Sequence, residues 1–134
     1  MANTFYDKGV EKFSAAGINW PADNIKAVLV DVADYAFSQS HEFLSDVPSI
    51  GRVATSANMT GKTNTGGVLD VADFAFVAAT GDPSEAIIWY KDTGTAATSP
   101  LILYIDTATN LPVTPNGGDI NIIPNNGADK LARL

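Results

Sequence analysis

The sequence predicts a mainly β fold, an antiparallel β-sandwich or small barrel of about eight strands with a short N-terminal helix. Short apolar runs recur at spacings of about 8 to 15 residues, which is typical of antiparallel all-β domains. Asn-Gly dipeptides at 116–117 and 126–127 mark tight turns, because both residue types tolerate positive φ. With 134 residues, 46% hydrophobic and 17% charged, the chain has the composition of a globular domain. We expect one domain over residues 1–134, comprising a helical arm at 1–17 and a β body at 18–134.

The first expected element is a helix at residues 5–16. Thr4 can serve as its N-cap, and Gly17 follows it in the position that favours glycine. Apolar residues at i, i+4 and i+7 form one stripe along the helix: Tyr6, Val10 and Phe13. Gly9 weakens the helix by about 1 kcal/mol relative to alanine. We therefore expect the helix to pack against its own sheet or against a neighbouring subunit.

Nine short segments after the helix have the composition of strands. They are 25–30, 52–59, 62–64, 68–69, 74–77, 86–90, 101–106, 119–123 and 130–134. The unbroken apolar runs at 86–90 and 101–106 suit central strands covered on both faces. A glycine pair at 66–67 predicts a tight turn between two strands, and we expect residues 43–44 to form a short turn that directs two apolar side chains inward.

No group of residues in the sequence predicts catalysis, so we expect that the protein is not an enzyme. Residues 56–63 resemble a phosphate-binding loop, but Ser56 replaces its first glycine and residues 64–67 cannot start the helix that must follow. His41 is the single histidine, and no nucleophile motif surrounds it.

Acidic residues lie mostly at the ends of the expected strands. They are Asp31, Asp34, Asp70, Asp73, Asp82, Glu85, Asp92, Asp106 and Asp119. A pair of them could act in acid–base catalysis or bind calcium, but no run has the ligand spacing of a calcium loop. We expect no metal and no cofactor.

The formal charge of −7 argues against nucleic-acid binding, because phosphate backbones repel an acidic protein. The first seven residues lack the basic start and apolar run of a secretory signal, and no run approaches the roughly 18 apolar residues that span a bilayer. We expect no membrane association. The absence of cysteine fits assembly in a reducing cytoplasm.

Four aromatic residues are candidates for a binding surface. Aromatic side chains on one exposed sheet face stack on sugar rings or anchor a protein interface. The candidates are Trp20, Trp89, Tyr90 and Tyr104. Because Trp89 and Tyr90 are adjacent on an expected strand, they point to opposite faces. A carbohydrate-binding β module is therefore one alternative, and it requires an exposed aromatic pair.

Several short segments of the sequence resemble segments of small virion structural proteins of tailed bacteriophages, in the same order along nearly the whole chain. They are INW (18–20), DNIKAVLV (23–30), TGKT (60–63), YKDTGT (90–95), SPL (99–101), YID (104–106) and NGGD (116–119). These phrases fall at turns and strand starts and include no catalytic signature. The segment after residue 37 gives few matching phrases.

The resemblance implies a virion component without enzymatic activity, made in the host cytoplasm and located at the capsid surface. Its closest functional counterpart is a head decoration (cement) protein that binds the major capsid protein lattice and itself forms a homo-oligomer, with a trimer favoured. A tail or baseplate subunit is the alternative. The residues expected at the interface come from the helix and the segment that follows it. They are Phe5, Tyr6, Val10, Phe13 and Trp20.

Overall fold

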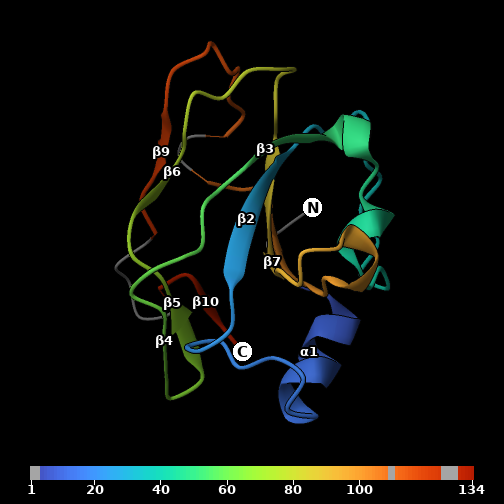
Figure 1. The fold of residues 1–134 in the computed structure, drawn as a ribbon, viewed down its shortest axis with the longest axis vertical. Helices are drawn as coiled ribbons and strands as arrows, with labels where there is room; N and C mark the ends of the chain where they lie inside the picture. Colours follow the sequence, from blue (N-terminus) through green and yellow to red (C-terminus); the bar gives the residue numbers. More distant parts are fainter. Residues whose placement is uncertain (1–3, 109–110, 125–129) are drawn as a thin grey trace.

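The computed structural model describes residues 4–108, 111–124 and 130–134. Within these residues the chain forms ten strands and a single α-helix, α1 (Asp7–Ser14), and every strand pairing is antiparallel (Figure 1). The predicted mainly β, sandwich-like fold with one short helix is therefore confirmed. The turn predicted at 126–127 lies outside the described residues.

A five-stranded sheet forms the centre of the molecule, with the order β1-β8-β7-β2-β3. Its strands are β1 (Thr4–Phe5), β2 (Ile25–Val30), β3 (Arg52–Thr55), β7 (Ala86–Lys91) and β8 (Leu101–Ile105). The apolar runs of β7 and β8 are buried on both faces, so the prediction of two fully covered central strands is confirmed.

Strand β3 is shorter than the strand expected at 52–59. The strand ends at Thr55 because the regular backbone hydrogen bonding to β2 is interrupted at the next residue. There the buried Ser56 hydroxyl, instead of a backbone carbonyl, accepts the N–H of Ala27 (2.9 Å). The chain stays beside β2 as far as Met59, whose N–H donates to the Ile25 carbonyl (2.7 Å).

Two smaller sheets cover one face of the central sheet. The first has the order β10-β5-β4, and the second pairs β6 with β9. Their strands are β4 (Thr63–Thr65), β5 (Val68–Asp70), β6 (Phe74–Phe76), β9 (Ile120–Ile122) and β10 (Ala132–Arg133). The predicted turn between β4 and β5 is confirmed, with both glycines at 66–67 in the left-handed region (φ 60° and 81°).

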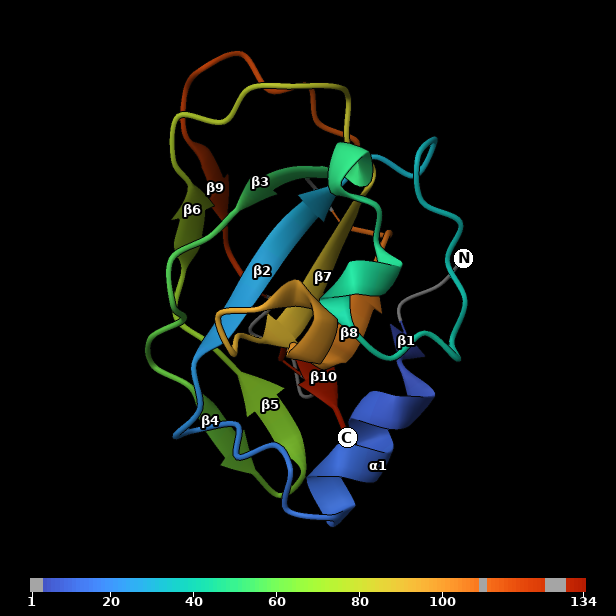
Figure 2. The ribbon, with the colours of Figure 1, turned by 45° about the vertical axis from the view of Figure 1, so that its right-hand side comes forward.

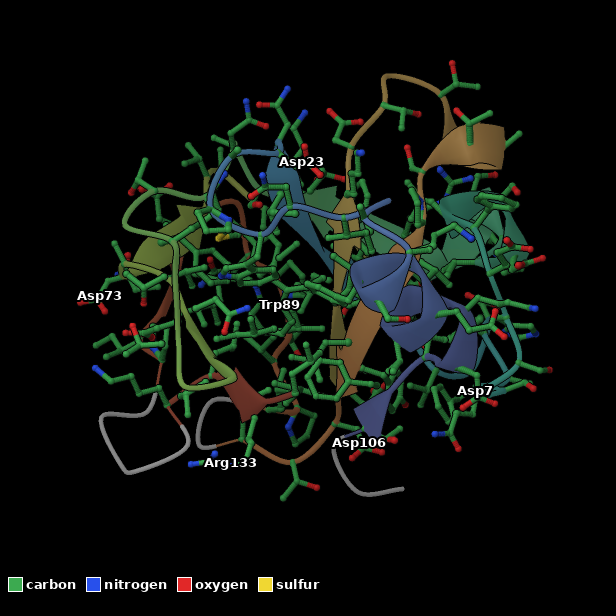
Figure 3. The ribbon with its side chains drawn as sticks, turned by 90° about the horizontal axis from the view of Figure 1, so that it is seen from below. Asp7, Asp23, Asp73, Trp89, Asp106 and Arg133 are labelled. Atoms are coloured by element: carbon green, nitrogen blue, oxygen red, sulfur yellow. The ribbon has the colours of Figure 1, made fainter. Side chains whose placement is uncertain are left out.

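The central sheet separates two hydrophobic cores. Trp89 and Leu29 point toward the small sheets, and Figure 3 shows Trp89 in the interior, surrounded by side chains. Ile88 and Tyr104 point to the opposite face, which is covered by loops and three 3₁₀-helices. These helices are η1 (Leu44–Asp46), η2 (Ser49–Gly51) and η3 (Ala96–Thr98), and the predicted inward turn at 43–44 leads into η1 with Leu44 buried.

The N-terminal segment differs from the arm expected at residues 1–17. Thr4 does not cap the helix, because it pairs with Tyr104 as part of the edge strand β1. Tyr6 is the N-cap residue and makes no side-chain cap hydrogen bond. Its N–H donates to the Ile102 carbonyl (2.9 Å) and its side chain is 0% exposed. From Thr4 onward the segment is therefore built into the central sheet and the core.

The helix also ends earlier than expected, at Ser14 rather than Ala16. The Gly17 N–H donates to the Lys12 carbonyl (2.7 Å) and the Ala16 N–H to the Phe13 carbonyl (3.4 Å). These two bonds form a Schellman motif. Its left-handed position is held by Ala16 (φ 61°) and not by the glycine one residue later.

Candidate functional site

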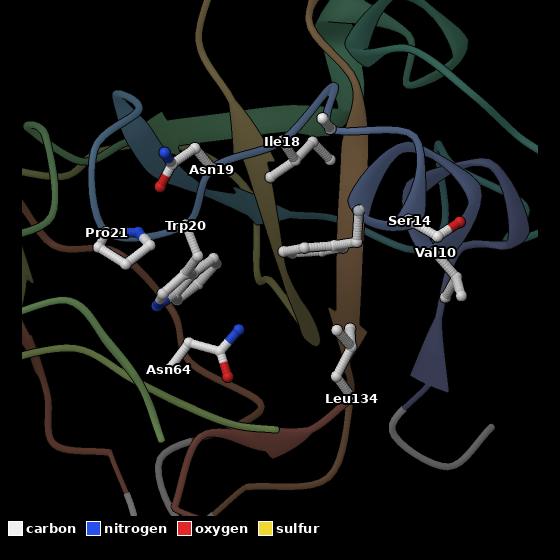
Figure 4. Close-up of a pocket in the computed structure, with 10 residues that line it drawn as sticks. Val10, Ser14, Ile18, Asn19, Trp20, Pro21, Asn64 and Leu134 are labelled. Atoms are coloured by element: carbon white, nitrogen blue, oxygen red, sulfur yellow. The ribbon is translucent and has the colours of Figure 1, made fainter. Parts of the chain in front are cut away.

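A pocket of about 470 Å³ lies between α1, the segment that follows it, and the tips of β4 and β10 (Figure 4). Its lining is mostly apolar and contains no charged side chain. The lining residues are Val10, Phe13, Ser14, Ala16, Ile18, Asn19, Trp20, Pro21, Asn64 and Leu134. We call it the α1 pocket.

The helix and the segment after it position the apolar wall of the α1 pocket. Val10 and Phe13, three residues apart on α1, lie on one side of the helix. The indole N–H of Trp20 donates to the Asp70 carbonyl (3.1 Å), which fixes the segment after the helix to the end of β5. The pocket therefore has walls held by hydrogen bonds to the β body.

Three of the five residues predicted for an interface line the α1 pocket: Val10, Phe13 and Trp20. Val10 is 44% exposed and available to a partner, whereas Trp20 is 1% exposed and contributes mainly to the core. Phe5 and Tyr6 lie elsewhere: Phe5 packs against the core beside β8 and Tyr6 is fully buried. Tyr6 cannot offer its side chain to a partner while this fold persists.

Two lining residues come from the β body, which the sequence did not connect with the interface. Asn64 belongs to a strand of exposed polar residues, and Leu134 is 46% exposed beside β10. No local pattern marks Asn64, because its position depends on long-range pairing between β4 and β5. The one available signal for Leu134 was its place at the end of the strand expected at 130–134.

Tyr6 takes part in a buried hydroxyl network below the loop that precedes η1. Its hydroxyl lies 3.0 Å from that of Tyr35, which lies 2.8 Å from Nδ1 of His41. Burial raises the pKa of the phenol groups of Tyr6 and Tyr35 above the usual range. The backbone N–H groups of Glu42 and Phe43 donate to Asp46 and hold its pKa below the usual range. The network ties the N-terminal segment to this loop, and His41 has a structural partner there.

The tryptophan and tyrosine side chains of the chain are all buried, with exposures of 0–3%. Neither Trp89 nor Tyr90, the adjacent pair considered for stacking, reaches the surface. Stacking on a sugar ring requires an open aromatic face. The exposed aromatic pair that a carbohydrate-binding module requires is not provided by these residues.

The residues that resemble a phosphate-binding loop have structural roles. Ser56 is buried and bonded to β2, and the Lys62 ammonium donates to the carbonyl of Asp23. The segment continues into β4 rather than a helix, so no helix N-terminus faces an anion there.

Two carboxylates from the turn after β2 meet a third from the segment before β7, at the opposite end of the central sheet from the α1 pocket. Asp31, Asp34 and Asp82 bring carboxylate oxygens within 4.8 Å of one another. Asp31 is buried and accepts the Ala33 N–H (2.9 Å). Oxygen ligands of this kind suit a hard cation such as Ca²⁺, but acidic groups also cluster at protein surfaces without an ion, so we assign no metal to them.

No family model matches the chain, and no curated protein is significantly similar to it. Among the described residues, α1 and the 3₁₀-helices are all too short and too polar to cross a membrane.

Proposed function

We propose that the protein is a structural subunit of a bacteriophage virion, a head decoration protein that binds and stabilises the lattice of the major capsid protein. The observation that supports this best is the α1 pocket: a largely apolar concavity beside the exposed Val10, with no charged side chain in its lining and with three lining residues that the sequence predicted for an interface. The proposal also rests on the resemblance of seven sequence phrases to phage virion proteins.

The proposed action is stabilisation by mass action. A protein that binds the assembled lattice and not its dissociated subunits shifts the equilibrium toward the closed shell. A standard interface buries about 800 Å² per partner. The accessible surface of the protein is 6496 Å², so contact with the lattice would use about one-eighth of it. The densely packed central sheet would keep this surface rigid.

A tail or baseplate subunit is the second candidate. The α1 pocket lies beside α1, and the Asp31–Asp34–Asp82 cluster includes the two aspartates that follow β2. Figure 1 shows α1 and the C-terminal end of β2 toward opposite ends of the long axis. A body with different surfaces at its two ends suits stacked assemblies, which are common in tails.

Copy number separates the two candidates. Quantitative mass spectrometry of purified virions should find this chain at a ratio between one to one and about one to a few relative to the major capsid protein if it decorates the head. A ratio of one to tens would transfer the proposal to the tail or a vertex. Absence from the particle would refute the virion proposal altogether.

A further inference from the structure

We propose that the guanidinium of Arg52 and the hydroxyl of Tyr90 form a binding site for an oxyanion, the chemical class that carboxylates and phosphates share. This inference goes beyond the proposed function and does not depend on it. It concerns the chemical group that one surface of the protein binds, wherever the protein is located.

Arg52 is the one basic side chain that has no bonded partner among the described residues. The sequence contains eight lysines and arginines and fifteen acidic residues. Five of the lysines form ion pairs with carboxylates: Lys8, Lys12, Lys26, Lys91 and Lys130. Lys62 donates to the Asp23 carbonyl, and Arg133 donates to the Gly66 carbonyl (3.4 Å). The fold therefore leaves the Arg52 guanidinium uncompensated in a chain that has an excess of carboxylates.

The Arg52 guanidinium is buried on one side and open on the other. Its Nε atom is buried and has no hydrogen-bond partner among the described residues. The terminal Nη groups are not buried in this way, so they reach the surface. Burial of a charged N–H group without an acceptor is costly. A charge that borders the protein interior is also screened less by water, which strengthens its attraction for an anion at the open side.

Strand pairing brings the phenol of Tyr90 to the same face of the central sheet as Arg52. Figure 2 shows β3 beside β2 at the edge of this sheet, and Arg52 in β3 lies opposite Val30 in β2. Directly paired residues of neighbouring strands project to one face, and Val30 shares a hydrophobic cluster with Tyr90 on the face that the loops cover. Burial and the charge of Asp92 raise the pKa of Tyr90 to about 12, and the charge of Arg52 opposes this rise. The guanidinium therefore lies within electrostatic reach of the phenol.

The Tyr90 hydroxyl is a second donor at this surface. Although the side chain is 3% exposed, its hydroxyl makes no hydrogen bond with the described residues and is not fully buried, so it reaches the surface. It stays protonated at neutral pH, because the pKa of Tyr90 is about 12, and it can donate to an anion. The nearby carboxylate of Asp92 is already paired with Lys26 (3.0 Å), the cross-strand neighbour of Tyr90. Asp92 therefore does not neutralise Arg52.

These two donors define the class of ligand. The planar N–H groups of a guanidinium fit the oxygen atoms of a carboxylate or a phosphate, and a phenol O–H can donate to either. The net charge of −7 repels anions in general. We therefore expect a free anion to bind weakly, with a dissociation constant in roughly the millimolar range.

Nuclear magnetic resonance of the isotope-labelled full chain tests the site directly. The chain has two arginines, Arg52 and Arg133, and the exposed Arg133 is the internal control. Titration with inorganic phosphate, and separately with acetate, should shift the Nε–H signal of Arg52 until it saturates and leave that of Arg133 nearly unchanged. Saturation by phosphate alone would identify a phosphate site. Saturation by acetate, with or without phosphate, would identify a carboxylate site.

Matched variants separate binding at this site from a general effect of salt. Arg52→Gln should abolish the saturable shifts of the backbone amides around the site, whereas Arg133→Gln should retain them. Tyr90→Phe should weaken binding about twofold to tenfold, the usual effect of one hydrogen bond. Tyr104→Phe is its control, because it removes another buried phenol hydroxyl from a different strand, β8.

Two results would overturn the inference. One is an equal, non-saturating drift of both arginine signals with both anions, and the other is equal anion binding by the wild type and Arg52→Gln. The titration of the wild type is decisive even where a variant fails to fold. None of these measurements depends on the copy number of the chain in virions, so failure of this inference and failure of the proposed function are distinguishable.

Discussion

Gly9 offers a direct test of how the helix is joined to the sheet. Intrinsic propensity predicts that Gly9→Ala stabilises α1 by about 1 kcal/mol. The structure predicts the opposite sign. A Cβ at this position would lie 2.5 Å from the Leu101 carbonyl oxygen and 3.1 Å from the Ile102 Cα. Ordinary contacts of a Cβ begin about 1 Å beyond the shorter of these distances.

The obstacle cannot move aside easily. It is the backbone of the buried strand β8, at the point where the register shifts opposite Trp89 and Tyr90. The Ile102 carbonyl also accepts the Tyr6 N–H. Lifting α1 by about 1 Å would weaken that bond and loosen the packing around buried Tyr6. Overpacking of a core typically costs 1–3 kcal/mol, and a rigid backbone obstacle belongs at the upper end, so the net loss after the propensity gain is about 2 kcal/mol.

Thermal denaturation followed by circular dichroism measures this difference. A loss of about 2 kcal/mol should lower the Tm of Gly9→Ala by roughly 6–10 °C in a domain of this size. Gly17→Ala is the control, because its Cβ would lie 3.4 Å from Lys12 atoms, within ordinary contact, and its Tm should stay close to that of the wild type. If Gly9→Ala melts at or above the wild-type temperature, the close approach of α1 to β8 is wrong.

Two further predictions concern stability. Ala16→Gly should raise the Tm by a few degrees, because alanine in the left-handed region (φ 61°) is strained by roughly 1–2 kcal/mol. Relief of this strain is offset only in part by the greater conformational freedom of glycine in the unfolded chain. A lower Tm would contradict the Schellman motif. Burial raises the pKa of Tyr90 and of Tyr104 to about 12, so their contribution to stability is complete below pH 10 and is lost as the pH rises to 12. Urea midpoints measured from pH 8 to 12 should fall across that window, and a flat profile would show that these phenols are not buried.

Elements with strong local patterns were the easiest to predict from the sequence. The strand expected at 25–30 is observed with the same bounds as β2, because its six residues are apolar except for Lys26 and the run ends before an aspartate turn. The central position of β7 and β8 follows from uninterrupted apolar sequence, which only burial on both faces accommodates. The turn at 66–67 follows from glycine chemistry alone.

Features that depend on long-range contacts could not be predicted in the same way. Thr4 has the side chain of a good N-cap, but pairing with Tyr104 on β8 competes for it and determines its backbone conformation. The helix ends at Ser14 because two bonds to Lys12 and Phe13 close a motif around Ala16, and propensity alone favours glycine in that place. In both cases tertiary or multi-residue geometry overrides a local preference.

Within α1, too, the local pattern predicts some features and long-range contacts determine the others. The spacing of Tyr6, Val10 and Phe13 places them in one apolar stripe. The spacing alone does not show how much of that stripe contacts the sheet. The structure places Tyr6 in the core on one side of the central sheet and packs Phe13 against the core on the other, while Val10 remains 44% exposed beside the α1 pocket. Because the apolar stripe is wider than the part of the helix that contacts the sheet, the residue at its margin stays exposed to solvent. Because the faces of the central sheet are covered by the small sheets and the loops, the apolar surface left open on this helix lies at such a margin, beside the α1 pocket.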